Sequence, residues 1–348
     1  MSAKIYFKFN NWFKKRKKVI IGLLTIVLII LMITIVDFSK FIQKLSIIGF
    51  FGLFLFLLLY SIAFLLRAYK LKLVFKGLDE KIDFFTLFFS IGTGFLINEL
   101  SPGKIGELAK IGFIKDQANT NLSNTICGVT IERFLDVILL FIISVFALFY
   151  LYESTIGKNE IREFLGYSIR IYLLIGTTFI LLIIFGLFLL IYKTNMILTI
   201  LAKISTKISN LVSKFVLNFK DGMKRFKNDK KIFIFVIFLG IPTWFIDASI
   251  IILFFYILGY ELHIMLLILA VILVFFSKSL PITPGGWGIS ENVGALFIFF
   301  FYPEIAFIEI LSIFIIDHLF RSAYIYFYGG YSVFHYNFKL REVSEDIL

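Results

Sequence analysis

The feature that most limits the possible folds of this chain is a series of apolar segments. A helix of about 20 apolar residues crosses the roughly 30 Å hydrocarbon core of a bilayer. Segments of this kind lie near residues 19–36, 45–66, 126–151, 169–192, 232–258 and 305–327. Because 60% of the residues are hydrophobic and only 17% are charged, the chain lacks the polar surface of a water-soluble fold. The sequence predicts an all-α polytopic membrane protein with about six full transmembrane helices.

Two further apolar stretches, residues 82–115 and 262–302, are each interrupted by a Pro-Gly turn. The turns read L-S-P-G-K-I-G at 100–106 and I-T-P-G-G-W-G at 282–288. A Pro-Gly turn cannot continue a helix, and lipid cannot satisfy the backbone groups that it frees. We therefore expect two helical hairpins that dip into the bilayer or just cross it. Their turns should be buried in protein or line a polar cavity, as in transporter binding sites.

The distribution of Lys and Arg predicts the orientation. Residues 1–18 end in five consecutive basic residues, so this N-terminal segment should be cytoplasmic. The connection that follows the second apolar segment is also basic and carries Arg67, Lys70, Lys72, Lys76 and Lys81. On this count the hairpin at 82–115 enters from the cytoplasm and the one at 262–302 from outside. The two hairpins form an inverted repeat in this interpretation, unless two Pro-Gly turns merely coincide.

The remaining chain divides simply on this interpretation. Residues 19–330 form one transmembrane domain of the cell membrane, and 331–348 form a short cytoplasmic tail. Residues 193–231 are a basic, amphipathic cytoplasmic connection, with apolar residues at helical spacing between 197 and 219. An interfacial helix on the anionic leaflet is one explanation, and a coiled-coil contact in a homodimer is the other. The net charge of +12 follows from this topology and requires no nucleic acid.

Three motifs occur in order: N-E-L-S-P-G-K-I-G-E at 98–107, I-E-R-F-L-D at 131–136 and P-I-T-P-G-G-W-G-I-S-E at 281–291. Together they resemble the lysylphosphatidylglycerol synthase transmembrane region, a flippase-like family of integral membrane proteins. The resemblance implies a polytopic helical protein that moves lipids or lipid-linked groups between leaflets. Other members join this region to a soluble aminoacyl transferase or sugar transferase domain. About 20 residues follow the last apolar segment here, so we do not expect this chain to aminoacylate lipids alone.

The two turns supply candidate residues for binding an anionic headgroup. Backbone N–H groups at a helix N-terminus attract anions, and glycine allows a phosphate to approach them. The candidates are Pro102, Gly103, Lys104 and Gly106 in the first turn and Pro284, Gly285, Gly286 and Gly288 in the second. Lys104, Arg133 and Arg321 are candidate phosphate partners. The alternative is that the glycines only allow close helix packing.

Charged residues follow both turns. Glu132, Arg133 and Asp136 share one helical face, and a charge near the bilayer centre costs about 2.5 to 3.5 kcal/mol on insertion scales. They must therefore face protein or water, either as an ion-pair cluster of Arg133 with Glu132 or Asp136, or as part of a transport path. Glu107 and Glu291 could bind a coupling cation or a proton, or could cap backbone donors.

Several kinds of chemistry find no support in the sequence. Cys127 is the single cysteine, the three histidines lack metal-ligand spacing, and no nucleotide-binding motif is present. We expect no metal, cofactor or catalytic residue. The predicted function is a translocase for an anionic lipid or a polyprenyl-phosphate-linked glycolipid. The alternatives are an intramembrane enzyme acting on a lipid phosphate, with Glu107, Glu132, Asp136 or Glu291 as acid or base, and a noncatalytic partner of a separate transferase.

Overall fold

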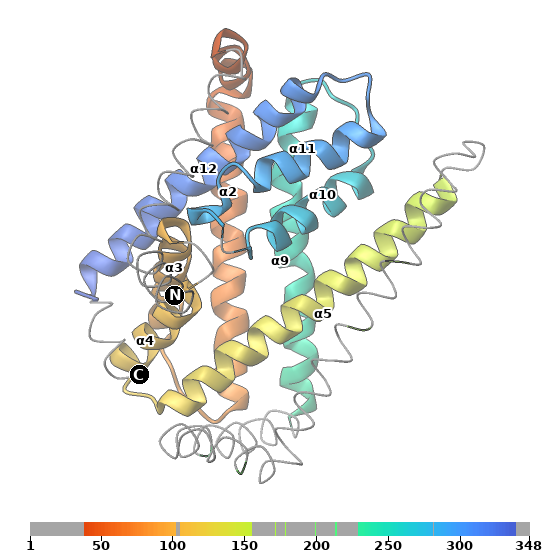
Figure 1. The fold of residues 1–348 in the computed structure, drawn as a ribbon. Coiled ribbons are helices and arrows are strands. Elements are labelled where there is room, and N and C mark those ends of the chain that lie inside the picture. The colour runs from red at the N-terminus through yellow and green to blue at the C-terminus, as the bar shows by residue number, and fades with distance from the viewer. Residues whose placement is uncertain are drawn as a thin grey trace, which may run out of the picture.

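The computed structural model describes residues 38–101, 105–154, 229–280 and 282–338, together with single helical residues at 171, 178, 199 and 213. All regular structure in this part of the chain is helical (Figure 1). The elements are α2 (Phe38–Gly77), α3 (Phe84–Leu100), α4 (Gly106–Ala118), α5 (Leu122–Ser154), α9 (Lys230–Ile257), α10 (Ile264–Ser277), η1 (Pro284–Gly286), α11 (Ser290–Phe301) and α12 (Phe307–His335). The predicted all-α fold is confirmed.

Four of the described helices, α2, α5, α9 and α12, are long and apolar enough to cross a membrane. They correspond to the apolar segments predicted at 45–66, 126–151, 232–258 and 305–327. The other two predicted spans, and nearly all of the connection at 193–231, lie outside the described residues. The outer face of α2 is apolar, with Phe50 84% exposed and Phe54 51% exposed, as suits a surface that faces lipid.

Both predicted hairpins are present. The first consists of α3 and α4, and the second of α10, η1 and α11. Asp83 caps α3 by accepting the Phe85 N–H at 2.7 Å, and His263 caps α10 by accepting the Met265 N–H at 3.3 Å. After α10 the chain reverses through Gly285 and Gly286, whose φ angles of 62° and 81° favour glycine.

The two hairpins start at opposite ends of the bundle, because α2 and α9 pack side by side in antiparallel directions (Figure 1). Gly52 of α2 faces Ile257 of α9, whereas Arg67 of α2 pairs with Asp247 of α9. The first hairpin follows the C-terminal end of α2 and the second follows that of α9. The tip of the second reaches α3, where Trp287 Nε1 donates to Glu99 Oε1 at 3.2 Å.

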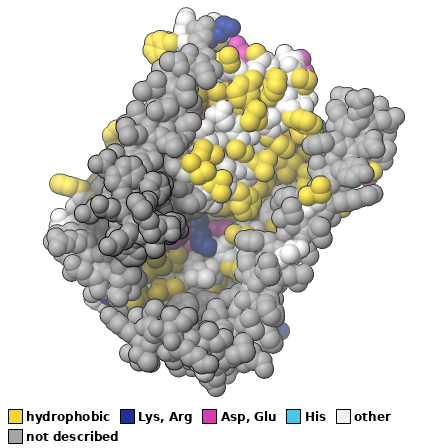
Figure 2. All heavy atoms as spheres, viewed as in Figure 1, with side chains coloured by type: hydrophobic (Ala, Val, Ile, Leu, Met, Phe, Trp, Pro, Cys, Tyr) yellow, Lys and Arg dark blue, Asp and Glu magenta, His cyan; other side chains and the backbone are white. Residues whose placement is uncertain are grey.

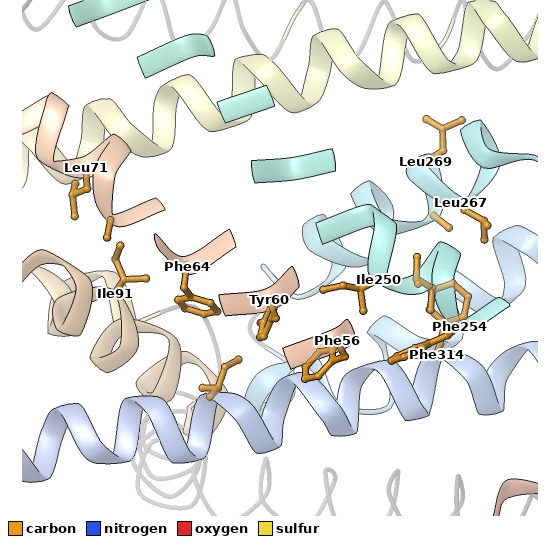
Figure 3. Packing of buried hydrophobic residues seen from close by; sticks show 14 of the residues in the cluster. Phe56, Tyr60, Phe64, Leu71, Ile91, Ile250, Phe254, Leu267, Leu269 and Phe314 are labelled. Carbon is orange, nitrogen blue, oxygen red and sulfur yellow. The ribbon is translucent and has the colours of Figure 1, made fainter. Parts of the chain in front are cut away.

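Aromatic side chains fill the interface between α2 and α12. Phe56, Tyr60 and Phe64 lie in a row along α2 and point toward α12 (Figure 3). The Tyr60 ring lies 5.0 Å from the rings of both Phe64 and Tyr324, and each pair meets edge to face. This geometry favours aromatic pairs. It fixes the position of α2, which carries Arg67 one turn beyond this row.

One feature of the predicted topology is wrong. Arg67 and Lys70 were expected in a cytoplasmic loop, but α2 continues to Gly77 and buries both side chains. Both pair with carboxylates inside the bundle, which makes their burial possible. At the other end of the chain, α12 continues to His335, so the predicted boundary of the tail at 331 falls within this helix.

Candidate functional site

A cavity of about 380 Å³ lies where the two hairpins meet the long helices. Its lining includes charged residues of α2, α3, α4, α5, α9 and α12 and the residue that follows α10. They are Arg67, Glu99, Glu107, Arg133, Asp247, Lys278, Asp317 and Arg321. Figure 2 shows basic and acidic side chains together in a hollow of a face whose described side chains are largely hydrophobic. The bundle therefore encloses a polar interior within an apolar shell.

Asp247 lies at the centre of one ion-pair network. Its carboxylate contacts the guanidinium of Arg67, and Arg321 Nη1 lies 3.5 Å from its other oxygen. Arg321 also donates from Nη2 to the Asp247 carbonyl at 2.9 Å and from Nε to Asp317 at 2.9 Å. An unpaired buried charge is costly, so this network holds α2, α9 and α12 in register.

The charged residues of α5 form ion pairs, but not all of the expected ones. Glu132 pairs with Lys110 of α4, and Asp136 pairs with Lys70 of α2. Arg133 Nε lies 3.0 Å from Glu107 Oε1, and its Nη1 lies 3.8 Å from Asp136. Of the two partners expected for Arg133, Asp136 is therefore found, whereas Glu132 pairs with a lysine from a neighbouring helix.

Of the charged residues predicted after the first turn, only some reach the cavity. Glu107 and Arg133 line it, whereas Glu132 and Asp136 are buried behind it, 1% and 5% exposed. Trp244 Nε1 also donates to Asp136 at 3.3 Å. The two inner carboxylates thus have their hydrogen-bond capacity directed at other protein groups, and the Glu107–Arg133 pair is the part of this cluster available to a ligand.

Glu291 accepts backbone and side-chain donors at the start of α11. Its Oε2 accepts the Gly288 N–H at 3.0 Å and the Ser290 hydroxyl at 3.1 Å, so it satisfies a backbone donor of the turn that precedes this helix. Its Oε1 contacts Nδ1 of His318 on α12. In the first hairpin, the Gly106 N–H donates to Asn98 Oδ1 at 2.8 Å. Both backbone donors are therefore already used within the protein.

The glycines of the second turn are required by close contacts. Gly285 lines the cavity, and a Cβ atom there would lie 2.9 Å from the Glu99 carboxyl carbon. Gly286 and Gly288 both have φ of 81°.

The other predicted site residues lie in different places. Pro284 begins η1, and Arg321 lines the cavity. Pro102, Gly103 and Lys104 lie outside the described residues.

Three cationic groups that line the cavity, Lys278, Arg67 and Arg133, have donors without a hydrogen-bond partner among the described residues. Among the acceptors, Glu107 Oε2 also lacks one. The Lys278 ammonium has no hydrogen bond or ion pair with any residue that the structure describes. Arg67 is only 8% exposed, and its Nη1 lacks a hydrogen-bond partner. Glu107, Asp247, Asp317 and Glu99 all have cationic or histidine partners. The donors left over in the cavity are therefore positively charged.

Several residues of this site were not predicted from the sequence. They are Arg67, Glu99, Asp247, Lys278 and His318. Two of them carry a signal that could have revealed them, because Asp247 is the one charged residue between 232 and 257, and Lys278 the one Lys, Arg, Asp or Glu between 262 and 290. A lone ionisable residue in an apolar segment marks a functional position.

The apolar helices and the charged interior define a multi-pass integral membrane protein. Residues 19–329 match the family described as the lysylphosphatidylglycerol synthase transmembrane region, and the chain belongs to that family, as its motifs predicted. The chain is also similar to a UPF0104 membrane protein of Methanocaldococcus jannaschii, with 26% identity over 196 residues that cover 56% of this chain and 75% of that protein. No solved structure matches the chain.

Proposed function

We propose that the protein is a lipid translocase of the cell membrane, with a cytoplasmic N-terminus, for lipids that carry an anionic phosphate. The substrate is an anionic phospholipid or a polyprenyl-phosphate-linked glycolipid. The observation that carries the proposal is the set of unused cationic donors, Lys278, Arg67 Nη1 and Arg133 Nε, in a cavity enclosed by apolar helices. A phosphate oxygen is the acceptor that such donors bind best.

The size and lining of the cavity support a headgroup as the ligand. Its 380 Å³ lies within the roughly 300 to 1,000 Å³ typical of small-molecule sites. Arg67 offers a planar guanidinium and Lys278 a point charge, which together suit a phosphate. Phe95, Val274 and Phe275 line the same cavity and offer apolar contacts to the first carbons of a lipid chain. A polar head joined to an apolar tail matches both parts of this lining.

The arrangement of the hairpins supports movement between leaflets. They start at opposite ends of the bundle, and the second contacts α3 beside the cavity. Broken helices that meet at depth are a common way to build a substrate site in transporters. A headgroup at this site would contact protein charges in place of water, instead of entering the hydrocarbon. These contacts lower the free-energy cost of moving the headgroup across the bilayer.

The test is lipid movement in reconstituted liposomes. Liposomes carrying the purified protein should lose outer-leaflet label of fluorescent phosphatidylglycerol faster than empty liposomes. Lys278→Gln removes one hydrogen bond from a charged donor, which contributes about 1.5 to 3 kcal/mol. The variant should therefore move phosphatidylglycerol between leaflets about tenfold or more slowly, relative to its movement of phosphatidylcholine. Lys72→Gln is the matched control, because Lys72 is exposed on α2 outside the cavity. Equal rates with and without protein would refute the function.

A further inference from the structure

We propose that Glu99, His318 and Glu291 form a proton-binding site that couples movement of the anionic lipid to a proton gradient. The inference rests on the proposed function and adds its energy source. The three side chains come from α3, α12 and α11, and their residues are 7%, 3% and 1% exposed. His318 Nδ1 contacts Glu291 Oε1, and His318 Nε2 lies 3.2 Å from Glu99 Oε1 but has no hydrogen-bond partner among the described residues.

The spacing of these atoms leaves a place for a proton between His318 Nε2 and Glu99. A neutral imidazole has one N–H and can donate to one carboxylate only, whereas an imidazolium donates to two. With a neutral ring and two ionised carboxylates, a ring lone pair would face a carboxylate oxygen. The trio has a net charge of −2 with a neutral ring and two ionised carboxylates, and one proton bound between the ring and a carboxylate brings the net charge to −1. A second proton on either carboxylate brings the net charge to zero.

An aromatic ring and three charged groups surround the imidazole of His318 and hold it in place. Trp287 stacks on the His318 ring at 4.0 Å with an angle of 9° between the planes, and an indole face attracts a cation. The charged groups that face the ring are Glu99 from α3, Glu291 from α11 and Lys278 from the end of α10. On α12 itself, the neighbouring Asp317 is paired with Arg321.

Glu99 connects this trio to the cavity. It lines the cavity, whereas Glu291 and His318 lie behind it. Its Oε1 also accepts from Trp287 Nε1 at 3.2 Å and from the hydroxyl of Ser322. A proton that enters from the cavity therefore meets Glu99 first and passes to the ring nitrogen beside it. No bond other than O–H and N–H forms or breaks in this transfer.

Lys278 couples the proton to the headgroup. It faces the trio and lines the cavity, so its ammonium is attracted by the trio's negative charge and by a bound phosphate. Protonation of the trio removes a negative charge near the phosphate position and strengthens phosphate binding. By linkage, a bound phosphate strengthens proton binding by the same factor. A site that moves between the leaflets with both ligands bound carries one proton with each lipid, which is proton–lipid symport.

The first experiment measures proton uptake without transport. Purified protein in weakly buffered detergent solution is mixed with dihexanoyl phosphatidylglycerol, and a pH indicator reports the protons taken up. The wild type should take up a proton when it binds this lipid, at a pH near the midpoint for protonation of the trio. His318→Gln and Glu99→Gln should abolish the uptake. His335→Gln should retain it, because His335 is an exposed residue at the end of α12 that stacks on Tyr331.

The second experiment imposes a pH difference across liposomes that contain the protein and fluorescent phosphatidylglycerol. With one proton per lipid, a difference of one pH unit supports about tenfold accumulation of lipid in one leaflet. Glu99→Gln should equalise the leaflets under the same gradient, and His335→Gln should behave as the wild type. Where His318→Gln does not fold, Glu99→Gln still tests the site, because a carboxamide keeps the shape of the side chain.

The outcomes separate the two proposals. If wild-type protein moves phosphatidylglycerol at the same rate with and without the gradient and takes up no proton, the proton site is refuted and the translocase stands. If it takes up a proton but moves no lipid, the translocase is refuted and the proton site stands. Proton uptake that is unchanged in both His318→Gln and Glu99→Gln would also refute the site.

Discussion

At the residue scale, Asp247 joins three helices. Its carboxylate contacts Arg67 of α2 and Arg321 of α12, and its own helix, α9, is otherwise apolar around it. The residue is 4% exposed, although its side chain lines the cavity, so its arginine partners provide most of its compensation. A buried pair of this kind adds little net stability, yet removing one partner leaves the other as an uncompensated charge.

Asp247→Asn should lower the free energy of unfolding by about 3 to 5 kcal/mol, because both arginines then lose their shared counter-charge. The measurement is denaturant unfolding of the purified variant in detergent. Lys40→Gln is the control, since Lys40 is 63% exposed and lies 3.5 Å from Glu309. That surface pair should contribute less than about 1 kcal/mol. Equal stability of both variants would mean that Asp247 is accessible to water.

Sequence patterns identified the charged face of α5 and the Arg133–Asp136 contact, but not the lysines that pair with Glu132 and Asp136. Glu132, Arg133 and Asp136 were predicted because three charges on one face of an apolar helix cannot face lipid. The lysine partners of Glu132 and Asp136 lie 22 and 66 residues away in the sequence, on α4 and α2 respectively. Such pairings depend on how helices pack, and local periodicity contains no information about that.

At the scale of elements, small residues decide how the first hairpin closes. Gly94 of α3 and Gly106 of α4 lie back to back, and a Cβ atom on Gly106 would lie 1.9 Å from the Gly94 carbonyl oxygen. The hairpin was predictable because a Pro-Gly turn separates two apolar runs. The crossing point was not, because a glycine in a membrane helix marks a close contact without naming its partner.

Gly106→Ala should separate α3 from α4 and destabilise the protein by about 1 to 3 kcal/mol or more, since the clash is with backbone that cannot rotate away. Thermal unfolding in detergent measures the effect. Gly330→Ala is a matched control in α12, because a Cβ atom there has no atom within 4 Å. Alanine at that helical position should be neutral or stabilise by about 0.5 to 1 kcal/mol. A Gly106→Ala protein as stable as the wild type would contradict the crossing.

At the scale of the whole molecule, the antiparallel packing of α2 and α9 determines where each hairpin begins. Apolar run length predicted the spans, and the Lys and Arg bias predicted that the hairpins start on opposite sides. The structure places the α2–α3 connection and the α9–α10 connection at opposite ends of the bundle (Figure 1). The charged cavity was not predictable as a unit, because it combines residues of seven α-helices, several of them distant in sequence.

This arrangement makes a topology prediction with Lys81 and Glu261, which are exposed in the two connections. In a Cys127→Ala background, Lys81→Cys and Glu261→Cys should react with a membrane-impermeant thiol reagent from opposite faces. Lys81→Cys should react from the cytoplasmic face, because basic connections stay on that side. Labelling in intact cells and in inverted vesicles measures both, with the Cys127→Ala protein as the unlabelled control. Rapid labelling of both positions from one face would contradict the inverted arrangement of the hairpins, and with it the path between leaflets on which the translocase proposal depends.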